Sequence, residues 1–168
     1  MDDTGHGPDH PDGVDGGQSS APDGNGRQPP EEAGQERTER VRGLFDAIPF
    51  HESHGVELLV VTPRRAETKL PFEESLVGNP DWEVIHGGVI SSLVDLTGAA
   101  VFMGQCGTYT PTVNLRVDYL EAAGREPLYA NATVERAGES IGVARVEVES
   151  GEGVCATGTG VYRLVDDG

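Results

Sequence analysis

The chain has 168 residues, enough for one domain with a real core, and its 29 acidic against 12 basic residues give a formal net charge of −17. This acidic balance argues against nucleic acid or an anionic membrane surface as a partner, because both are recognised through basic patches. The sequence shows neither a run of roughly 20 apolar residues that would span a membrane nor a secretory signal, so we expect a cytoplasmic protein.

Residues 1–36 differ in composition from the rest of the chain. They are rich in Gly, Pro and Asp, and Met1 and Val14 are their only sizeable apolar side chains. Such a segment buries too little apolar surface to offset the entropy of ordering, which predicts a disordered acidic tail. Residues 37–168 are then expected to form a single domain.

Apolar periodicity predicts the first elements of this domain. Helical spacing from Val41 to Ile48 indicates a short helix that ends before Pro49. Alternation next predicts two strands. Their inward faces are expected to carry Val56, Leu58 and Val60 in the first strand, and Ala66, Thr68, Leu70 and Phe72 in the second. Residues 73–85 are predicted to be a loop.

The second half is predicted to hold one long apolar helix, roughly residues 88–103, and four strands. The strands begin near Val113, Leu128, Ala144 and Val154, and glycines near the intervening turns indicate an antiparallel meander. One face of such a sheet needs an apolar cover. The central helix is the only long apolar element available, so the sheet should wrap it in an α+β fold.

Asp95 is the only formally charged side chain between Glu83 and Arg116, although 24% of the chain is charged. A carboxylate in apolar surroundings costs several kcal/mol unless it is paired or hydrogen-bonded. A surface aspartate on the outer side of an amphipathic helix is the simpler alternative. The uncharged neighbours favour a functional site instead.

A helical wheel separates Asp95 from the predicted core stripe. Ile90, Leu93, Val94, Thr97 and Val101 cluster on the side that should face the sheet, and Asp95 lies about 140° from Ile90. The Asp95 face carries Ser91, Gly98, Ala99 and Phe102. Since a solvent face on this acidic protein should carry several carboxylates, we expect another subunit or a ligand to cover it.

The start of this helix, His86-Gly87-Gly88, adds a second half to the candidate site. Glycines permit tight backbone geometry and leave the first amide groups open. Those amides and the helix dipole favour an oxygen that gains negative charge during acyl transfer. A plain loop-to-helix turn is the alternative for these glycines, and a purely structural hydrogen bond is the alternative for His86.

These residues carry a resemblance to a known family. The segment N-P-x5-H-G-G-V-I-S-S-L-V-D-L-T-G-A-A, followed by T-P-T-V-N-L-R-V-D-Y-L, resembles the hotdog-fold acyl-CoA thioesterases of the phenylacetate-degradation (PaaI-like) type. The resemblance covers about residues 40–165. It implies an antiparallel sheet wrapped around one helix, and subunits that pair edge to edge as a homodimer or homotetramer.

The resemblance also implies roles for five residues. Asp95 would be the general base or nucleophile at the thioester carbonyl, and Thr112 would assist it. The Gly87 N–H would bind the developing oxyanion, and His86 would support that loop. Asn79 would hold the attacking water or the carbonyl, although the stretch from Asp81 to Ile85 lacks a glycine that the family often has. The site would lie between subunits, with Asn79, His86 and Gly87 from one and Asp95 and Thr112 from the other.

The predicted activity is hydrolysis of an acyl-CoA thioester to a free acid and CoA without a metal or redox cofactor. A non-catalytic acyl-CoA sensor is the alternative, and a hotdog hydratase ranks last. The cysteines Cys106 and Cys155 have no metal-site spacing and read as small buried hydrophobes. Lys69 is the one lysine, and an acidic surface so poor in lysine suggests a halophilic protein, since self-repulsion is tolerable where about 1 M salt screens it.

Overall fold

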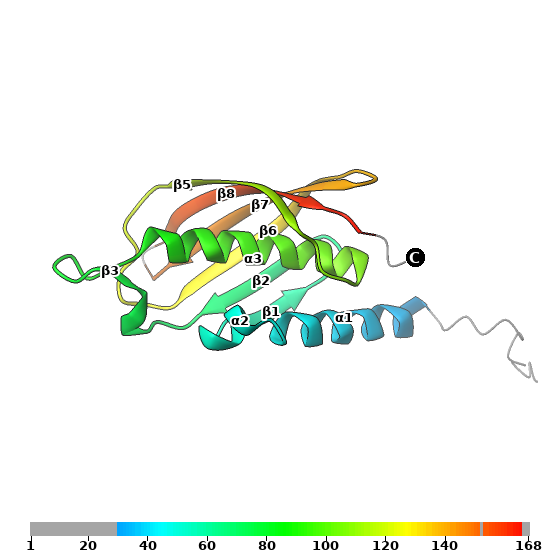
Figure 1. The fold of residues 1–168 in the computed structure, drawn as a ribbon, viewed down its shortest axis with the longest axis horizontal. Helices are drawn as coiled ribbons and strands as arrows, with labels where there is room; N and C mark the ends of the chain where they lie inside the picture. Colours follow the sequence, from blue (N-terminus) through cyan, green and yellow to red (C-terminus); the bar gives the residue numbers. More distant parts are fainter. Residues whose placement is uncertain (1–29, 152, 166–168) are drawn as a thin grey trace, which may run out of the picture.

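The computed structural model describes residues 30–151 and 153–165 (Figure 1). Helix α1 (Pro30–Asp46) precedes the short helix α2 (Pro49–Ser53), which has proline in its first turn. The helix break before Pro49 is confirmed. Helix α1 starts at Pro30, inside the segment expected to be a tail, and residues 1–29 of that segment lie outside the described residues.

One antiparallel sheet and one long helix dominate the described chain, which confirms the α+β prediction. The strands in spatial order are β1 (Glu57–Val61), β2 (Arg65–Leu70), β6 (Leu128–Ala137), β7 (Ile141–Ser150), β8 (Gly153–Arg163) and β5 (Thr112–Tyr119). Helix α3 (Gly87–Cys106) lies across the curved inner face of this sheet, and α1, followed by α2, packs beside α3 next to β1 (Figure 1).

The predicted apolar stripe of α3 forms the centre of the core. Its residues are almost completely buried, with relative exposures of 3% for Ile90, 1% for Leu93 and 0% for Val94, Thr97 and Val101. The buried partners on the sheet come from alternating positions of β2, β6 and β7, among them Ala66, Leu128, Ala132, Val146 and Val148. Each fully buried Val, Leu or Ile side chain contributes roughly 1.5–3 kcal/mol, so this stripe fixes the helix on the sheet. Although α3 is long and apolar enough to cross a membrane, most of it is buried by the protein itself.

Strand β5 does not follow the predicted meander. Strands β6, β7 and β8 are consecutive neighbours, but β5 pairs with β8, with Thr112 opposite Tyr162 and Tyr119 opposite Ala156. The connection over residues 120–127 therefore spans three strand spacings, about 14 Å, which eight extended residues cover easily at up to about 3.3 Å each. A short connection alone did not require β5 and β6 to be neighbours.

The inward face of β1 also differs from the simple alternation. A register irregularity between Leu58 and Val60 shifts the pairing with β2. Leu58 is buried, and beyond the irregularity Val61 rather than Val60 is buried. An extra residue in one strand turns the following side chains to the opposite face, and this change is invisible in the apolar pattern.

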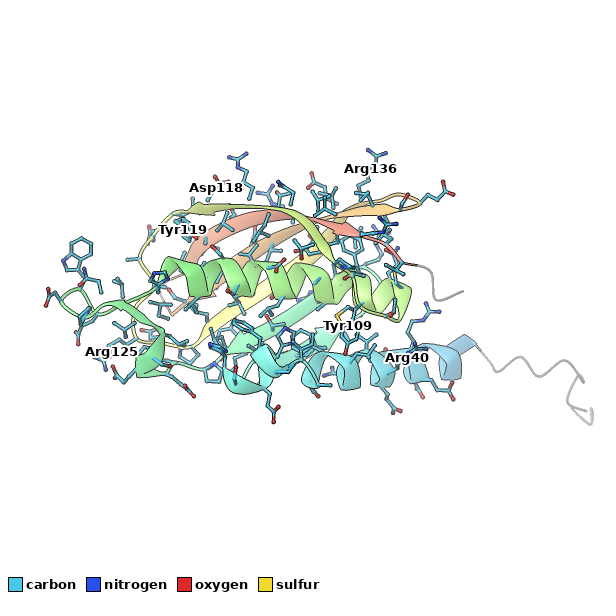
Figure 2. All side chains as sticks on the ribbon, in the orientation of Figure 1. Arg40, Tyr109, Asp118, Tyr119, Arg125 and Arg136 are labelled. Atoms are coloured by element: carbon cyan, nitrogen blue, oxygen red, sulfur yellow. The ribbon has the colours of Figure 1, made fainter. Side chains whose placement is uncertain are left out.

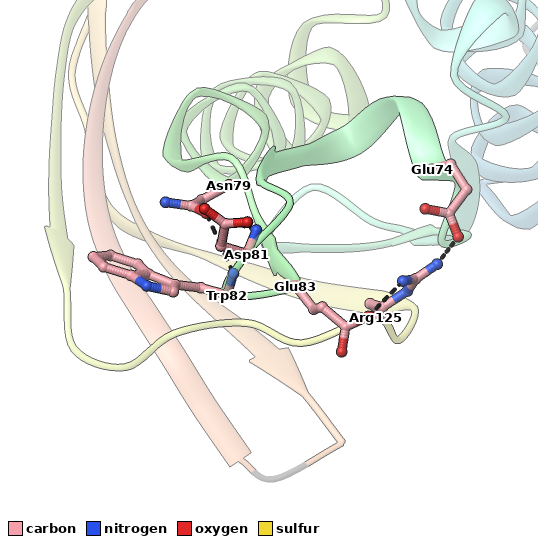
Figure 3. A network of polar contacts seen from close by, with 6 residues as sticks. All are labelled: Glu74, Asn79, Asp81, Trp82, Glu83 and Arg125. Carbon is pink, nitrogen blue, oxygen red and sulfur yellow. Dashed lines mark hydrogen bonds and ion pairs between the residues drawn. The ribbon is translucent and has the colours of Figure 1, made fainter.

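The predicted loop before α3 is a small hairpin in the structure. It comprises a 3-10 turn (Glu74–Leu76), strand β3 (Val77–Asn79) and strand β4 (Val84–Ile85). The guanidinium of Arg125 donates to Glu83 Oε1 at 2.8 Å and also pairs with Glu74 (Figure 3). The same guanidinium lies 5.4 Å from the centroid of the Phe72 ring. Arg125 thereby ties the hairpin to the body of the domain beside the start of α3.

Candidate active site

Asp95 and Thr112 lie together, as the resemblance predicted. Asp95 is partly buried on the middle of α3, and Thr112 begins the neighbouring strand β5. Thr112 Oγ1 donates to Asp95 Oδ1 at 2.7 Å, while no described residue bonds to Oδ2. One carboxylate oxygen is therefore held in place, and the other is available to a water molecule or a substrate carbonyl.

Tyr162 on β8 supports the backbone of Asp95. Its hydroxyl donates to the Asp95 carbonyl oxygen at 3.0 Å, and the ring is completely buried. Burial raises the pKa of this phenol, and the nearby Asp95 carboxylate raises it further, so Tyr162 stays a hydrogen-bond donor. A Cβ atom on Gly98 or on Gly160 would lie 2.1 Å from the Tyr162 hydroxyl oxygen.

This packing corrects the prediction for the Asp95 face of α3. We expected another subunit or a ligand over Gly98 and Phe102. In the structure Tyr162 occupies the space beside Gly98, and the Phe102 ring is buried with its centroid 5.5 Å from that of Tyr162. The small residue at position 98 makes room for a buried tyrosine of the same chain, because the strand opposite supplies a large side chain at that point.

The start of α3 presents one open amide. His86 is the N-cap, and its Nδ1 accepts a hydrogen bond from Gly88 N at 2.9 Å, while its carbonyl oxygen accepts from Val89 N at 2.9 Å. Within the described chain the Gly87 N–H has no such partner. An open N–H at the positive end of a helix is suited to an oxyanion. His86 positions this turn through its own cap hydrogen bond.

Tyr119 fixes the same turn from strand β5 (Figure 2). Its hydroxyl donates to the Gly87 carbonyl oxygen at 3.0 Å and forms a short hydrogen bond with Ser91 Oγ. A Cβ atom on Gly87 would lie 3.4 Å from the Tyr119 ring, so glycine gives the ring close access to the helix start. Strand β5 thus contacts both candidate groups, Asp95 through Thr112 and Gly87 through Tyr119.

Asn79 lies at the end of β3, where its side chain closes the hairpin turn (Figure 3). Its Oδ1 accepts hydrogen bonds from Asp81 N at 2.9 Å and from Trp82 N at 3.2 Å. The acceptor oxygen is thereby engaged, so the side-chain amide N–H groups are what Asn79 has to offer a ligand. The turn also holds Glu83 at a φ of 54°, a conformation that is uncommon without glycine.

The five predicted residues form two groups on one chain. Asp95 and Thr112 are hydrogen-bonded to each other, whereas Asn79, His86 and Gly87 lie at the N-terminal end of α3. Asp95 lies eight positions after Gly87 along the helix, which corresponds to about 12 Å. A single reacting carbonyl does not reach both groups of one chain, since its partners must lie about 3 Å away.

Several supporting residues were missed from the sequence. Tyr119 alternates with Val117 and Leu115, so the strand pattern already placed it on the face toward α3. Tyr162 and Thr110 gave no comparable signal, because their contacts depend on which strands are neighbours. Thr110 Oγ1 donates to the Ala99 carbonyl oxygen at 3.1 Å, and Tyr109 donates to the Leu44 carbonyl oxygen at 3.4 Å.

An antiparallel sheet curved around one long helix is the hotdog fold. A solved structure from Shewanella oneidensis, described as related to the thioesterase superfamily, is 28% identical with a TM-score of 0.69, covering 79% of this chain and 98% of its own. A thioesterase family protein from Silicibacter pomeroyi shares the fold with a TM-score of 0.70 at 22% identity, covering 76% of this chain and 96% of its own.

Sequence comparison places the chain in one family. The thioesterase superfamily profile matches residues 83–157, which include the helix start, Asp95 and Thr112. The medium/long-chain acyl-CoA thioesterase YigI of Escherichia coli is 30% identical over 133 residues, covering 70% of this chain and 86% of its own. The chain belongs to the thioesterase superfamily and is an enzyme of the thioester hydrolase class.

Proposed function

We propose that this protein hydrolyses an acyl-CoA thioester to a free acid and CoA, with Asp95 as the catalytic carboxylate. The observation that carries the proposal is the Asp95 side chain, held at Oδ1 by Thr112 and open at Oδ2. Membership of the thioesterase superfamily and the similarity to an acyl-CoA thioesterase support the substrate class. The PaaI-like subtype, a cytoplasmic location and adaptation to high salt are part of the same proposal.

Two routes lead from this carboxylate to the products. In one, Asp95 takes a proton from water, the resulting hydroxide adds to the thioester carbonyl, and the C–S bond breaks to release CoA thiolate, which is then protonated. In the other, Asp95 attacks the carbonyl itself, the C–S bond breaks to release CoA thiolate, which is then protonated, and water hydrolyses the resulting anhydride to the free acid and Asp95. Both routes place a negative charge on the carbonyl oxygen, where an N–H donor such as that of Gly87 stabilises it.

The separation of Asp95 from Gly87 favours a site shared by two subunits. About 12 Å of helix separates the two groups in one chain, so the oxyanion donor that serves Asp95 would be the partner subunit's Gly87. A twofold axis that sets two α3 helices antiparallel would create two such sites per dimer. Asn79 and His86 would accompany Gly87, while Thr112 would accompany Asp95.

The two edges of the sheet differ in a way that supports pairing through β5. At the β1 edge, the Arg42 guanidinium donates to the carbonyl oxygens of Leu58 at 2.6 Å and Leu59 at 2.9 Å, which blocks a further strand. At the other edge, β5 has no second strand neighbour within the described chain, and Val113 and Tyr119 are 60% and 53% exposed. An open apolar edge of this kind favours strand addition by another copy.

The proposal is tested with purified protein, a panel of acyl-CoA substrates and thiol trapping at high salt. We expect Asp95→Asn to fold normally and to lose turnover by roughly 100-fold or more. Near-normal hydrolysis by this variant would reject Asp95 as the catalytic group. Binding of acyl-CoA by the unmodified protein without thiol release would instead reject hydrolysis as its activity.

The oxyanion donor is tested separately with Gly87→Pro. Proline is favoured in the first turn of a helix, and His86 before it has φ −63° and ψ 133°, an extended conformation that proline accepts. The substitution therefore removes the N–H with little disturbance of the backbone, and we expect a loss of roughly 100- to 1000-fold in kcat. Gly87→Ala keeps the N–H and is the matched control. Equal activity of the two variants would reject the Gly87 amide as the oxyanion donor.

A further inference from the structure

A cavity of about 240 Å³ opens beside Asp95, between α2, α3 and residues 109–111. Apolar parts of Ile48, Leu96, Ala99 and Met103 form much of its wall. Two polar residues of the wall are already committed, because Tyr109 donates to the Leu44 carbonyl and Thr110 donates to the Ala99 carbonyl. Asp95 and His51 are the remaining polar side chains along it.

His51 is fixed by two contacts with Phe45. Its Nδ1 is 2.9 Å from the Phe45 carbonyl oxygen, and its ring centroid is 4.0 Å from that of Phe45. A carbonyl only accepts hydrogen bonds, so Nδ1 carries the proton. The side chain is 6% exposed, and burial lowers its pKa, which keeps the imidazole neutral near pH 7. Nε2 therefore carries a lone pair and acts as an acceptor.

The structure gives Nε2 no hydrogen-bond partner within the described chain. Among the described residues, Gln105 Oε1 is the one fully buried side-chain oxygen or nitrogen that lacks a hydrogen-bond partner. Since His51 Nε2 also lacks a partner, it is not fully buried and retains some contact with solvent. His51 is almost entirely buried and is one of the residues that line this cavity. An unpaired acceptor in an apolar wall favours a ligand that brings a donor.

We propose that this cavity holds the acyl group of the substrate and that His51 Nε2 accepts a hydrogen bond from a hydroxyl group on it. This inference rests on the proposed function, because Asp95 sets where the thioester carbonyl lies. A cavity of 150 Å³ accommodates benzene, so about 240 Å³ suits one substituted ring or an aliphatic chain of similar size. The larger nucleotide arm of CoA, with its phosphates, fits neither the volume nor the apolar wall. His51 is thus a specificity-determining residue for hydroxylated acyl groups.

Two substitutions separate the recognition role of His51 from its structural role. His51→Asn keeps an N–H that reaches the Phe45 carbonyl but removes the acceptor at Nε2. His51→Gln places an amide oxygen near the position of Nε2 and gives up the bond to Phe45. The substrates are pairs of acyl-CoA thioesters that differ by one hydroxyl group, placed at each successive position of a six-carbon chain and of a phenylacetyl ring.

We expect the unmodified protein to favour the hydroxylated member of at least one pair in kcat/KM. His51→Asn should reduce that preference by about tenfold, the effect of one hydrogen bond between neutral groups, and His51→Gln should keep most of it. A non-hydrolysable thioether analogue of the preferred pair should show the same order of binding by calorimetry. In protein with ¹⁵N-labelled histidine, only the hydroxylated analogue should shift the Nε2 signal.

Two outcomes would overturn the inference. No preference for a hydroxylated member in the unmodified protein would show that His51 does not recognise such a group. An equal loss by His51→Asn on both members of every pair would assign Nε2 to a bound water or to the fold. If no thioester is hydrolysed while the hydroxylated analogue still binds better and shifts Nε2, the proposed activity fails and the recognition by His51 stands.

Discussion

Replacing Gly98 by alanine tests the packing that supports Asp95. The added Cβ would lie 2.1 Å from the Tyr162 hydroxyl oxygen and 2.8 Å from its Cζ, and the buried ring has no room to move away. Overpacking of this kind costs about 1–3 kcal/mol, whereas alanine in place of glycine inside a helix gains about 1 kcal/mol. The difference is a net loss of up to about 2 kcal/mol in unfolding free energy.

The assay is urea and thermal unfolding in high salt, with turnover measured on the same samples. A loss of about 2 kcal/mol lowers Tm by roughly 4–8 °C for a chain of this length. Gly43→Ala is the matched control, since Gly43 is an exposed glycine of α1 whose added Cβ meets nothing within 4 Å. That variant should gain about 1 kcal/mol from helix propensity alone.

A double-mutant cycle with Tyr162→Phe assigns the cause. Removing the hydroxyl deletes the 2.1 Å contact but leaves the 2.8 Å contact to Cζ, so Gly98→Ala should cost about 1 kcal/mol less in that background. The coupling would be the signature of direct contact between positions 98 and 162. If Gly98→Ala is as stabilising as Gly43→Ala, Tyr162 does not fill this space and the account of Asp95 support is wrong.

Other predictions concern titration, thiols and the sheet edge. Burial lowers the pKa of His51, so below about pH 6.5, the usual histidine pKa, the unfolded chain binds a proton at this position more readily than the folded protein does. The free energy of unfolding should therefore fall as the pH drops below about 6.5. His51→Asn should remove this part of the decline in urea titrations. Burial raises the pKa of the Cys155 thiol, so a thiol reagent should leave it unmodified in the native protein and modify it after unfolding. Val113→Lys on exposed β5 should weaken self-association in sedimentation experiments by placing like charges at the edge.

Contrary results are equally specific. A pH decline that is unchanged in His51→Asn would assign it to other groups. Rapid modification of Cys155 in the folded protein would show that the β8 strand opens locally. Unchanged sedimentation of Val113→Lys would show that β5 is not the edge through which copies pair.

The central helix and the candidate site residues on it could be predicted because their signals are local. The stripe from Ile90 to Val101 repeats with the helical period, and a lone charge at Asp95 stands out against uncharged neighbours. Alternation likewise identified the buried face of β2, since Ala66 and Thr68 each point inward. These features depend on residues a few positions apart.

The features of the fold and the site that could not be predicted depend on contacts between segments distant in the sequence. Position 98 read as room for a ligand or another subunit, whereas a tyrosine 64 positions later fills it, and only the β8 strand register brings the two together. The placement of β5 beside β8 and the irregularity in β1 likewise follow from pairing that a single strand does not encode. His51 has no distinguishing signal in the sequence, because the Phe45 carbonyl that fixes its tautomer comes within reach only in the folded turn.

A site shared between subunits is tested most directly by complementation between two inactive variants. Asp95→Asn and Gly87→Pro are purified separately, unfolded and refolded together, and hydrolysis is compared with each variant refolded alone. In a mixed dimer one site combines Asp95 of the second chain with Gly87 of the first, so random pairing should restore about a quarter of the normal activity. Activity that stays at the level of the separate variants, although mixed dimers are shown to form, would contradict the shared site.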